Sequence, residues 1–264
     1  MANFLLSQVV GLLTKITPSD FFHPNSVGAR LLRPIINSVL PSKWAWLKVV
    51  SGPCRGMWLL INVKNDKSFI LGKREEKLVE ALCHALHPGA SFWDIGAYNG
   101  YYSLLGSKLV GPAGKVLAIE PVPENAQRLR AAVEKNQLNN IQVVEIAVSS
   151  SEGITAIKAY GRTSITKSRE LMQGLAEDLI EVPTTTMAKL IERFGPPNVV
   201  KIDVEGMEID VLRGMDPVMR ESKSQFFIEF HSEELLSTER KMLPQYDFKP
   251  VDPPIHWWLS PNNK

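Results

Sequence analysis

The chain has few of the features that mark disulfide-rich, membrane-spanning or nucleic-acid-binding proteins. Only two cysteines occur among its 264 residues, Cys54 and Cys83, and they form no CxxC pair. A disulfide framework or a zinc knuckle is therefore not expected. No apolar run reaches the roughly 18 residues that a membrane span requires. The 30 basic residues nearly balance the 28 acidic ones, so no strong net charge indicates nucleic acid as a partner.

The first 42 residues differ from the rest. Apolar residues recur at helical spacing from Leu5 to Ile16, and four prolines then divide the segment. We expect a helical arm that packs on the domain or on a second copy of the chain, which is compatible with a homodimer. A helix resting on a membrane is the alternative, although Lys15 is the only Lys or Arg among the first 29 residues. No pattern of a secretory signal is present, so a cytoplasmic location is expected.

Beyond a short β-hairpin expected within residues 45–63, strand and helix patterns alternate along the chain. Apolar strands are predicted at 91–95, 115–120, 141–146, 198–203 and 225–230, with helical patterns between them, and further strands at 153–160, as an edge strand, and at 179–182. Such alternation predicts an α/β fold with a doubly wound, mostly parallel sheet covered on both faces. Ligands bind at the carboxyl edge of such a sheet, where the strand order reverses.

The strongest motif follows the strand at 91–95, where residues 94–100 read DIGAYNG. Gly96 allows a sharp turn and a close backbone approach, and Gly100 allows tight packing in the first turn of the next helix. The glycines are spaced GxxxG, not GxGxxG as in dinucleotide-binding folds, and Asp94 would repel a pyrophosphate. A ligand that carries an ammonium and a sulfonium suits Asp94 better, which argues against a nucleotide-dependent oxidoreductase.

Two later strand ends complete the expected cofactor site. Glu120 ends the second apolar strand, where a carboxylate can accept hydrogen bonds from both ribose hydroxyls, and Pro121 fixes the loop after it. Ala147 and Val148 follow the strand at 141–146. Small apolar side chains at that position can form a wall for an adenine ring.

Ionisable side chains gather at the ends of the last two core strands. Lys201 and Asp203 share one face of their strand by its two-residue period, and Glu229 and His231 share a face of the next strand. Asp203, Glu229 or His231 can remove a proton from a hydroxyl, and the sequence leaves open which of them is the base. The same three side chains can hold a divalent cation, but no metal is expected. Lys201 can equally be the partner of a core carboxylate such as Glu229.

A weaker pattern consists of Glu80, His84 and His87, which lie at helical spacing and offer ligands for zinc. We interpret the two histidines instead as residues at the C-terminal end of a helix. There an imidazolium meets the negative pole of the helix dipole.

As a set, these motifs resemble the FkbM-type methyltransferases. The matching segments are DIGAYNGYYS at 94–103, AIEPVPENAQRL at 118–129, KNQLNNIQVVEIAVSSSEG at 135–153, VPTTTMAKLI at 182–191, VVKIDVEGMEIDVLRGM at 199–215 and FFIEFH at 226–231. The resemblance covers about residues 68–250 and implies a Rossmann-like class I fold with a seven-stranded sheet. The chain is accordingly divided into an arm and hairpin at 1–67 and a methyltransferase domain at 68–264.

The resemblance also implies which residues meet the cofactor, S-adenosylmethionine. Asp94, Gly96, Asn99 and Gly100 would contact its methionine part, and Glu75 or Glu76 would reach it from the first core helix. The full expected cofactor set is Glu75, Asp94, Gly96, Ala97, Asn99, Gly100, Glu120, Pro121, Ala147 and Asp203. The expected catalytic set is Asp203, His231, Glu229 and Lys201.

The resemblance implies methyl transfer to an oxygen, on a hydroxyl of a sugar, a polyketide-like compound or another small natural product. Two alternatives stay open at this point. One is a non-catalytic cofactor-binding or scaffold protein. The other is a membrane-associated methyltransferase that acts on a lipid-linked acceptor through contact of the N-terminal arm with the membrane.

Overall fold

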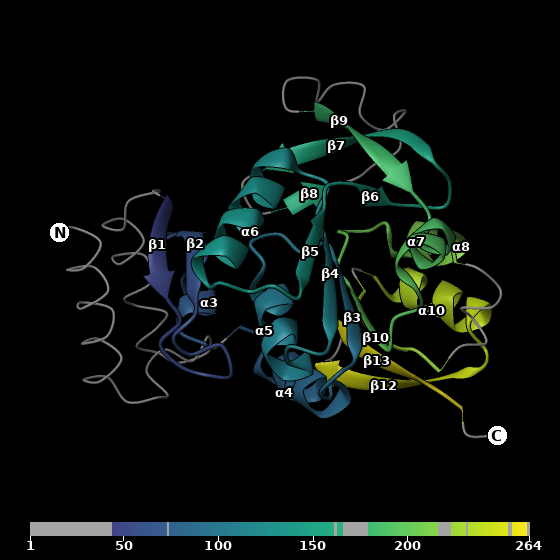
Figure 1. Cartoon of the computed structure of the whole chain (residues 1–264). Coiled ribbons are helices and arrows are strands. Elements are labelled where there is room, and N and C mark those ends of the chain that lie inside the picture. Colours follow the sequence, from purple (N-terminus) through teal and green to yellow (C-terminus); the bar gives the residue numbers. More distant parts are fainter. Residues whose placement is uncertain are drawn as a thin grey trace, which may run out of the picture. The chain divides into compact units, whose positions relative to one another are not determined.

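The computed structural model describes residues 44–72, 74–160, 163–165, 179–215, 223–230, 232–252 and 255–262 (Figure 1). The chain divides into two compact units between Arg74 and Glu75. The arm expected over residues 1–42 and the candidate base His231 lie outside the described residues. No helix among the residues described is long and apolar enough to cross a membrane.

The first unit contains the hairpin that the sequence predicts. Strands β1 (Trp44–Lys48) and β2 (Trp58–Asn62) pair antiparallel, and the short helix α3 (Lys67–Ile70) follows. Alternate residues of the strands, among them Leu47, Leu59 and Ile61, are buried, as expected for strands with one face on a small core.

The second unit has a sheet with the strand order β12-β13-β11-β10-β3-β4-β5. Its strands are β3 (Ser91–Ile95), β4 (Lys115–Ile119), β5 (Ile141–Val144), β10 (Val199–Ile202), β11 (Gln225–Glu229), β12 (Tyr246–Asp252) and β13 (His256–Pro261). From β11 to β5 all neighbours are parallel, and β13 and β12 add an antiparallel edge. This is the seven-stranded, mostly parallel sheet that the sequence and its resemblance predict.

Helices cover both faces of this sheet. They are α4 (Glu76–Ala85), α5 (Tyr101–Val110), α6 (Pro123–Lys135), α7 (Met187–Phe194), α8 (Glu208–Arg213) and α10 (Glu233–Met242). Figure 1 shows α4, α5 and α6 on one face, with α7, α8 and α10 on the other. Because both faces are covered, the central strands are buried throughout, and even Lys201 of β10 is 3% exposed.

A separate four-stranded sheet has the order β6-β9-β7-β8. Its strands are β6 (Ala147–Val148), β7 (Gly153–Tyr160), β8 (Thr163–Ile165) and β9 (Leu179–Thr185). The expectation of an edge strand at 153–160 was wrong in its placement, because β7 pairs on both sides, with β9 and with β8. Strand periodicity reveals alternating burial, but it carries no information about which sheet a strand joins.

Two carboxylates are buried where α8 packs on α10. Glu208 and Glu239 are both 0% exposed, and neither carboxylate oxygen of Glu239 has a hydrogen-bond partner among the described residues. Burial, reinforced by the charge of Glu208, raises the pKa of Glu239 to about 9. At neutral pH the folded protein therefore holds a proton on Glu239 that the unfolded chain releases.

We predict that Glu239→Gln makes stability less dependent on pH. In the wild type, the proton on Glu239 stabilises the fold fully below its ordinary pKa of 4.5 and progressively less up to about pH 9. As the pH rises through this range, the free energy of unfolding of the variant should therefore increase relative to that of the wild type, by at most about 1.4 kcal/mol per pH unit. Urea denaturation at pH 5, 7 and 9 measures the difference. Glu234→Gln, at an exposed position of the same helix, is the control, and equal pH profiles for wild type and Glu239→Gln would contradict the prediction.

Candidate functional site

The turn after β3 brings the ends of two strands into direct contact. Gly96 has a φ of +81°, and a Cβ added to it would lie 1.8 Å from the backbone carbonyl oxygen of Asp203. The backbone N–H groups of Gly96 and Ala97 both donate to the carbonyl of Ile119, each at 2.9 Å. A side chain at position 96 would thus separate β3 from β10. The close approach that the sequence predicts for Gly96 is made to the protein's own backbone.

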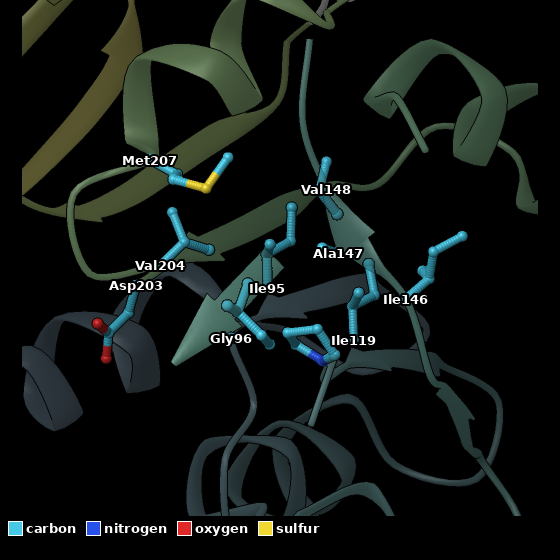
Figure 2. A pocket seen from close by; sticks show the side chains of 11 residues that line it. Ile95, Gly96, Ile119, Ile146, Ala147, Val148, Asp203, Val204 and Met207 are labelled. Carbon is cyan, nitrogen blue, oxygen red and sulfur yellow. The ribbon is translucent and has the colours of Figure 1, made fainter. Parts of the chain in front are cut away.

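An apolar pocket lies at this carboxyl edge, and its empty space of about 400 Å³ includes open solvent. Its lining residues are Ile95, Gly96, Ile119, Pro121, Ile146, Ala147, Val148, Ile157, Asp203, Val204 and Met207. Figure 2 shows the carboxylate of Asp203 at one end and the side chains of Ile146 and Val148 at the other. The pocket therefore offers an apolar slot with a single negative charge at one end, and four expected cofactor residues line it: Gly96, Pro121, Ala147 and Asp203.

Glu120 lies behind this lining and is 2% exposed. Its Oε2 accepts from the N–H of Tyr98 at 2.8 Å, and its Oε1 accepts from the N–H of Val122 at 3.0 Å and from Asn125 Nδ2 at 3.1 Å. Burial raises the pKa of Glu120, and these three hydrogen bonds oppose the rise. A carboxylate has about four acceptor positions, so one position remains on Oε2. This count covers the described residues, and the contact of Glu120 with the ribose hydroxyls stays a prediction.

The other residues of the glycine motif shape the start of α5. The Oδ1 of Asn99 accepts from the N–H of Tyr101 at 3.1 Å. Gly100 has a φ of +84°, and a Cβ there would lie 2.2 Å from Leu129 Cδ1 of α6. The tight packing predicted for Gly100 is therefore present. Neither Asn99 nor Gly100 lines the pocket, so their contact with a cofactor stays a prediction.

Asp94 is completely buried and takes part in an ion cluster. Its Oδ2 accepts from the hydroxyl of Ser103 at 2.6 Å, and its Oδ1 lies 3.7 Å from the Nζ of Lys201. The Nζ of Lys201 also lies 3.3 Å from the Oδ2 of Asp203 and 4.9 Å from the centre of the Tyr102 ring. Asp94 and Lys201 are register partners on adjacent strands, which explains why their side chains meet.

The charges in this cluster depend on one another. Burial by itself lowers the pKa of Lys201, but the attraction of Asp203 and Asp94, with that of Glu75 and Glu229, raises it above its ordinary value. Burial raises the pKa of Asp94, although Lys201 and Ser103 act against the rise. Lys201 is thus a permanent cation at the strand ends. It pairs with Asp94 and Asp203, so the alternative in which Lys201 is the partner of a core carboxylate is met by Asp94.

A second group of side chains lies beside this cluster. The Nε2 of His256 is 3.5 Å from the Oε2 of Glu75 and 3.4 Å from the Oε2 of Glu229, and the hydroxyl of Tyr102 donates to Glu75. Burial lowers the pKa of His256, but the two carboxylates outweigh it and raise the pKa to about 9. Of the two candidate glutamates at the start of α4, Glu75 reaches this group, whereas Glu76 is exposed.

Three residues of the site were missed by the sequence analysis. Ser103 and Tyr102 follow the glycine motif directly, and their place in the first turn of a helix after a ligand-binding turn could have indicated them. His256 carries no such signal, because it reaches the site only through the antiparallel pairing of β13 with β11. Trp258 of β13 stacks on Phe227 of β11 with ring centroids 5.7 Å apart.

We predict that Lys201→Met lowers the free energy of unfolding by about 3 kcal/mol or more, because it leaves Asp94 buried without a cationic partner. Adding Asp94→Asn should recover a large part of that loss, since a neutral amide removes the unpaired charge. Lys189→Met, at a half-exposed side chain paired with Glu192, should cost little. Chemical denaturation of the wild type, Lys201→Met, Asp94→Asn, their double variant and Lys189→Met tests this, and additive losses in the double variant would show that the two residues are not coupled.

Comparison with known proteins agrees with this geometry. The model of the methyltransferase FkbM domain matches residues 94–250. The hexuronic acid methyltransferase AglP of Haloferax volcanii is 26% identical over 165 residues, which cover 60% of this chain and 63% of that protein. The protein-L-isoaspartate O-methyltransferase of Aeropyrum pernix is 38% identical over 79 residues, 30% of each chain.

Among solved structures, an FkbM methyltransferase from Methylobacillus flagellatus KT aligns with 73% of this chain and 52% of its own, at 19% identity and a TM-score of 0.45. The chain thus spans less than two thirds of the length of each of these three relatives. The FkbM model, by contrast, matches more than half of this chain and includes the glycine turn, the pocket and the Asp94–Lys201–Asp203 cluster. The chain belongs to the methyltransferase FkbM domain family.

Proposed function

We propose that the protein binds S-adenosylmethionine in the apolar pocket and transfers its methyl group to a hydroxyl oxygen of a sugar. The observation that carries the proposal is the pocket itself: an apolar slot at the carboxyl ends of β3, β4 and β10, with the carboxylate of Asp203 at one end. Membership of the family supports the reaction class.

The residues present fit such a cofactor. Ile146, Ala147 and Val148 suit the faces of an adenine ring, and the remaining acceptor position of Glu120 suits one ribose hydroxyl. Asp203, at the opposite end of the slot (Figure 2), suits the cationic part of the molecule. The bound cofactor would supply an activated methyl group on a positively charged sulfur.

The protein's own part in the reaction is to position the acceptor oxygen and to exclude water from it. Alignment of an acceptor oxygen with the methyl group can lower the barrier by about 7–11 kcal/mol. As the O–CH₃ bond forms and the S–CH₃ bond breaks, the sulfur keeps the electron pair and the hydroxyl loses its proton to a base. Asp203 is our candidate for the base, because it lines the pocket and is held by Lys201. Glu229 and His231 remain candidates of the same kind.

A sugar is the acceptor class that the comparisons favour. AglP, which matches 60% of this chain, is named as a methyltransferase of hexuronic acid. The isoaspartate methyltransferase matches only 30% of the chain. Hexuronic acids, neutral hexoses and lipid-linked sugars are therefore the acceptors to compare first.

We predict that Ala147→Trp abolishes binding of S-adenosylhomocysteine, because the indole fills the apolar end of the pocket. Calorimetric titration measures the binding, and circular dichroism verifies the fold. Ile154→Trp, at a position of β7 that is 73% exposed, introduces the same side chain away from the pocket and should bind like the wild type. Unchanged affinity in Ala147→Trp would mean that the cofactor binds elsewhere.

We also predict that Asp203→Asn lowers kcat for transfer of labelled methyl to a sugar by about 10²–10⁴-fold. Affinity for S-adenosylhomocysteine should change much less, because its sulfur carries no positive charge for Asp203 to attract and the pocket keeps its shape. Asp210→Asn, at the partly exposed partner of Arg213 on α8, is the matched control. Cofactor binding without transfer to any acceptor class would favour the non-catalytic alternative, and transfer confined to lipid-linked sugars would favour the membrane-associated one.

A further inference from the structure

Three side chains with metal-binding atoms meet beside Lys201. They come from three separate elements: Glu75 precedes α4, Glu229 ends β11, and His256 begins β13. One ligand atom of each lies within 4.8 Å of the other two. We propose that Glu75, Glu229 and His256 bind one divalent transition-metal ion, Mn²⁺ or Zn²⁺.

The spacing of these atoms is that of ligands around a common ion. The Nε2 of His256 lies 3.4 and 3.5 Å from the two carboxylate oxygens, which is longer than an ordinary N–H···O hydrogen bond of 2.7–3.2 Å. Ligands placed about 2.0–2.1 Å from a tetrahedral ion lie about 3.3 Å from one another. Both distances from His256 therefore suit ligands of one ion, and all three atoms lie within 4.8 Å of one another.

The burial of His256 gives further support. Its ring is 6% exposed, and within the part of the chain that the structure describes its near polar contacts are the two carboxylates at Nε2, neither of which meets the geometry of a hydrogen bond. A buried polar group of this kind is costly unless it is satisfied, and a metal ion on Nε2 would satisfy it.

The ligands are also held in place before any ion binds. Glu229 and His256 are direct register partners of β11 and β13, so their side chains lie on the same face of the sheet. Glu75 has a φ of +46°, which is uncommon for a residue with a side chain, and it accepts a hydrogen bond from Tyr102. Partners of this kind orient metal ligands and are typical of functional metal sites.

The charges of the neighbourhood leave room for a cation. Lys201 lies 3.3 Å from Asp203 and 3.7 Å from Asp94, so its charge is matched by those two residues. Glu75 and Glu229 then supply two negative charges that His256 alone would balance only in part. Two carboxylates and one imidazole are a ligand set that suits Mn²⁺ or Zn²⁺.

The place of the site suggests its use, and this step rests on the proposed function. Glu229 ends β11, which pairs in parallel with β10, the strand that leads to Asp203. An ion at Glu229 would therefore lie at the same carboxyl edge of the sheet as Asp203, the candidate base. Coordination of that hydroxyl would lower its pKa and so ease removal of its proton.

The test is direct binding of the metal to the purified full chain. After removal of metals with EDTA, calorimetric titration with MnCl₂ and with ZnCl₂ should show one ion per chain. Glu229→Gln and His256→Gln should weaken binding by about 100-fold or more, beyond the 10–100-fold effect of removing a supporting residue. His84→Gln, at an exposed histidine of α4, should bind as the wild type does.

A second measurement needs no variant and guards against loss of folding. Pulsed electron paramagnetic resonance of Mn²⁺ bound to the wild type should show nitrogen coupling from one imidazole. Absence of stoichiometric binding, absence of nitrogen coupling, or equal binding in His256→Gln would overturn the proposal. Titration of the metal-free protein with S-adenosylhomocysteine separates the two ideas. Cofactor binding without a metal site would leave the proposed function intact, and a metal site without cofactor binding would overturn the proposed function alone.

Discussion

The buried ammonium group of Lys201 holds the ends of the central strands together. It lies between the carboxylate of Asp203, directly after its own strand β10, and that of Asp94 on the neighbouring strand β3. The ring of Tyr102 from α5 faces it as well. A cation that is 3% exposed is tolerated only because these partners surround it. The consequence is that β3, β10 and the start of α5 keep a fixed geometry at the edge where a ligand would bind.

Both halves of the site depend on the segment after β3. Gly96 allows the close approach of β3 and β10 beside the pocket, and Ser103, further along the same segment, donates a hydrogen bond to Asp94. Tyr102 contacts Lys201 with its ring and Glu75 with its hydroxyl. One short stretch of sequence therefore shapes the slot assigned to the cofactor and supports the charged groups next to it. Substitutions in this segment would therefore affect the slot and the charged groups together.

Most of the architecture could be predicted because parallel strands buried on both faces leave continuous apolar runs, as from Val116 to Ile119 in β4. The pairing of Asp94 with Lys201 was not predicted. It depends on which strands are neighbours, and a sequence pattern does not give that order. His256 was missed for the same reason: it lies in the antiparallel edge, far along the chain from Glu75. Asp94 also shows what a motif leaves out. The sequence identified it as an acidic residue at a strand end, but not its contacts with Ser103 and Lys201 inside the protein.

The separate sheet has a further consequence for how such a protein can diversify. Ala147 of β6 is the register partner of Thr184 of β9, so the chain leaves and re-enters the domain at one point. Between these residues, insertions or deletions would alter neither the order nor the register of the seven central strands. Ala147 and Ile157 nevertheless both line the pocket. A change in this excursion therefore reshapes one wall of the pocket while the seven-stranded sheet that carries the other walls is kept.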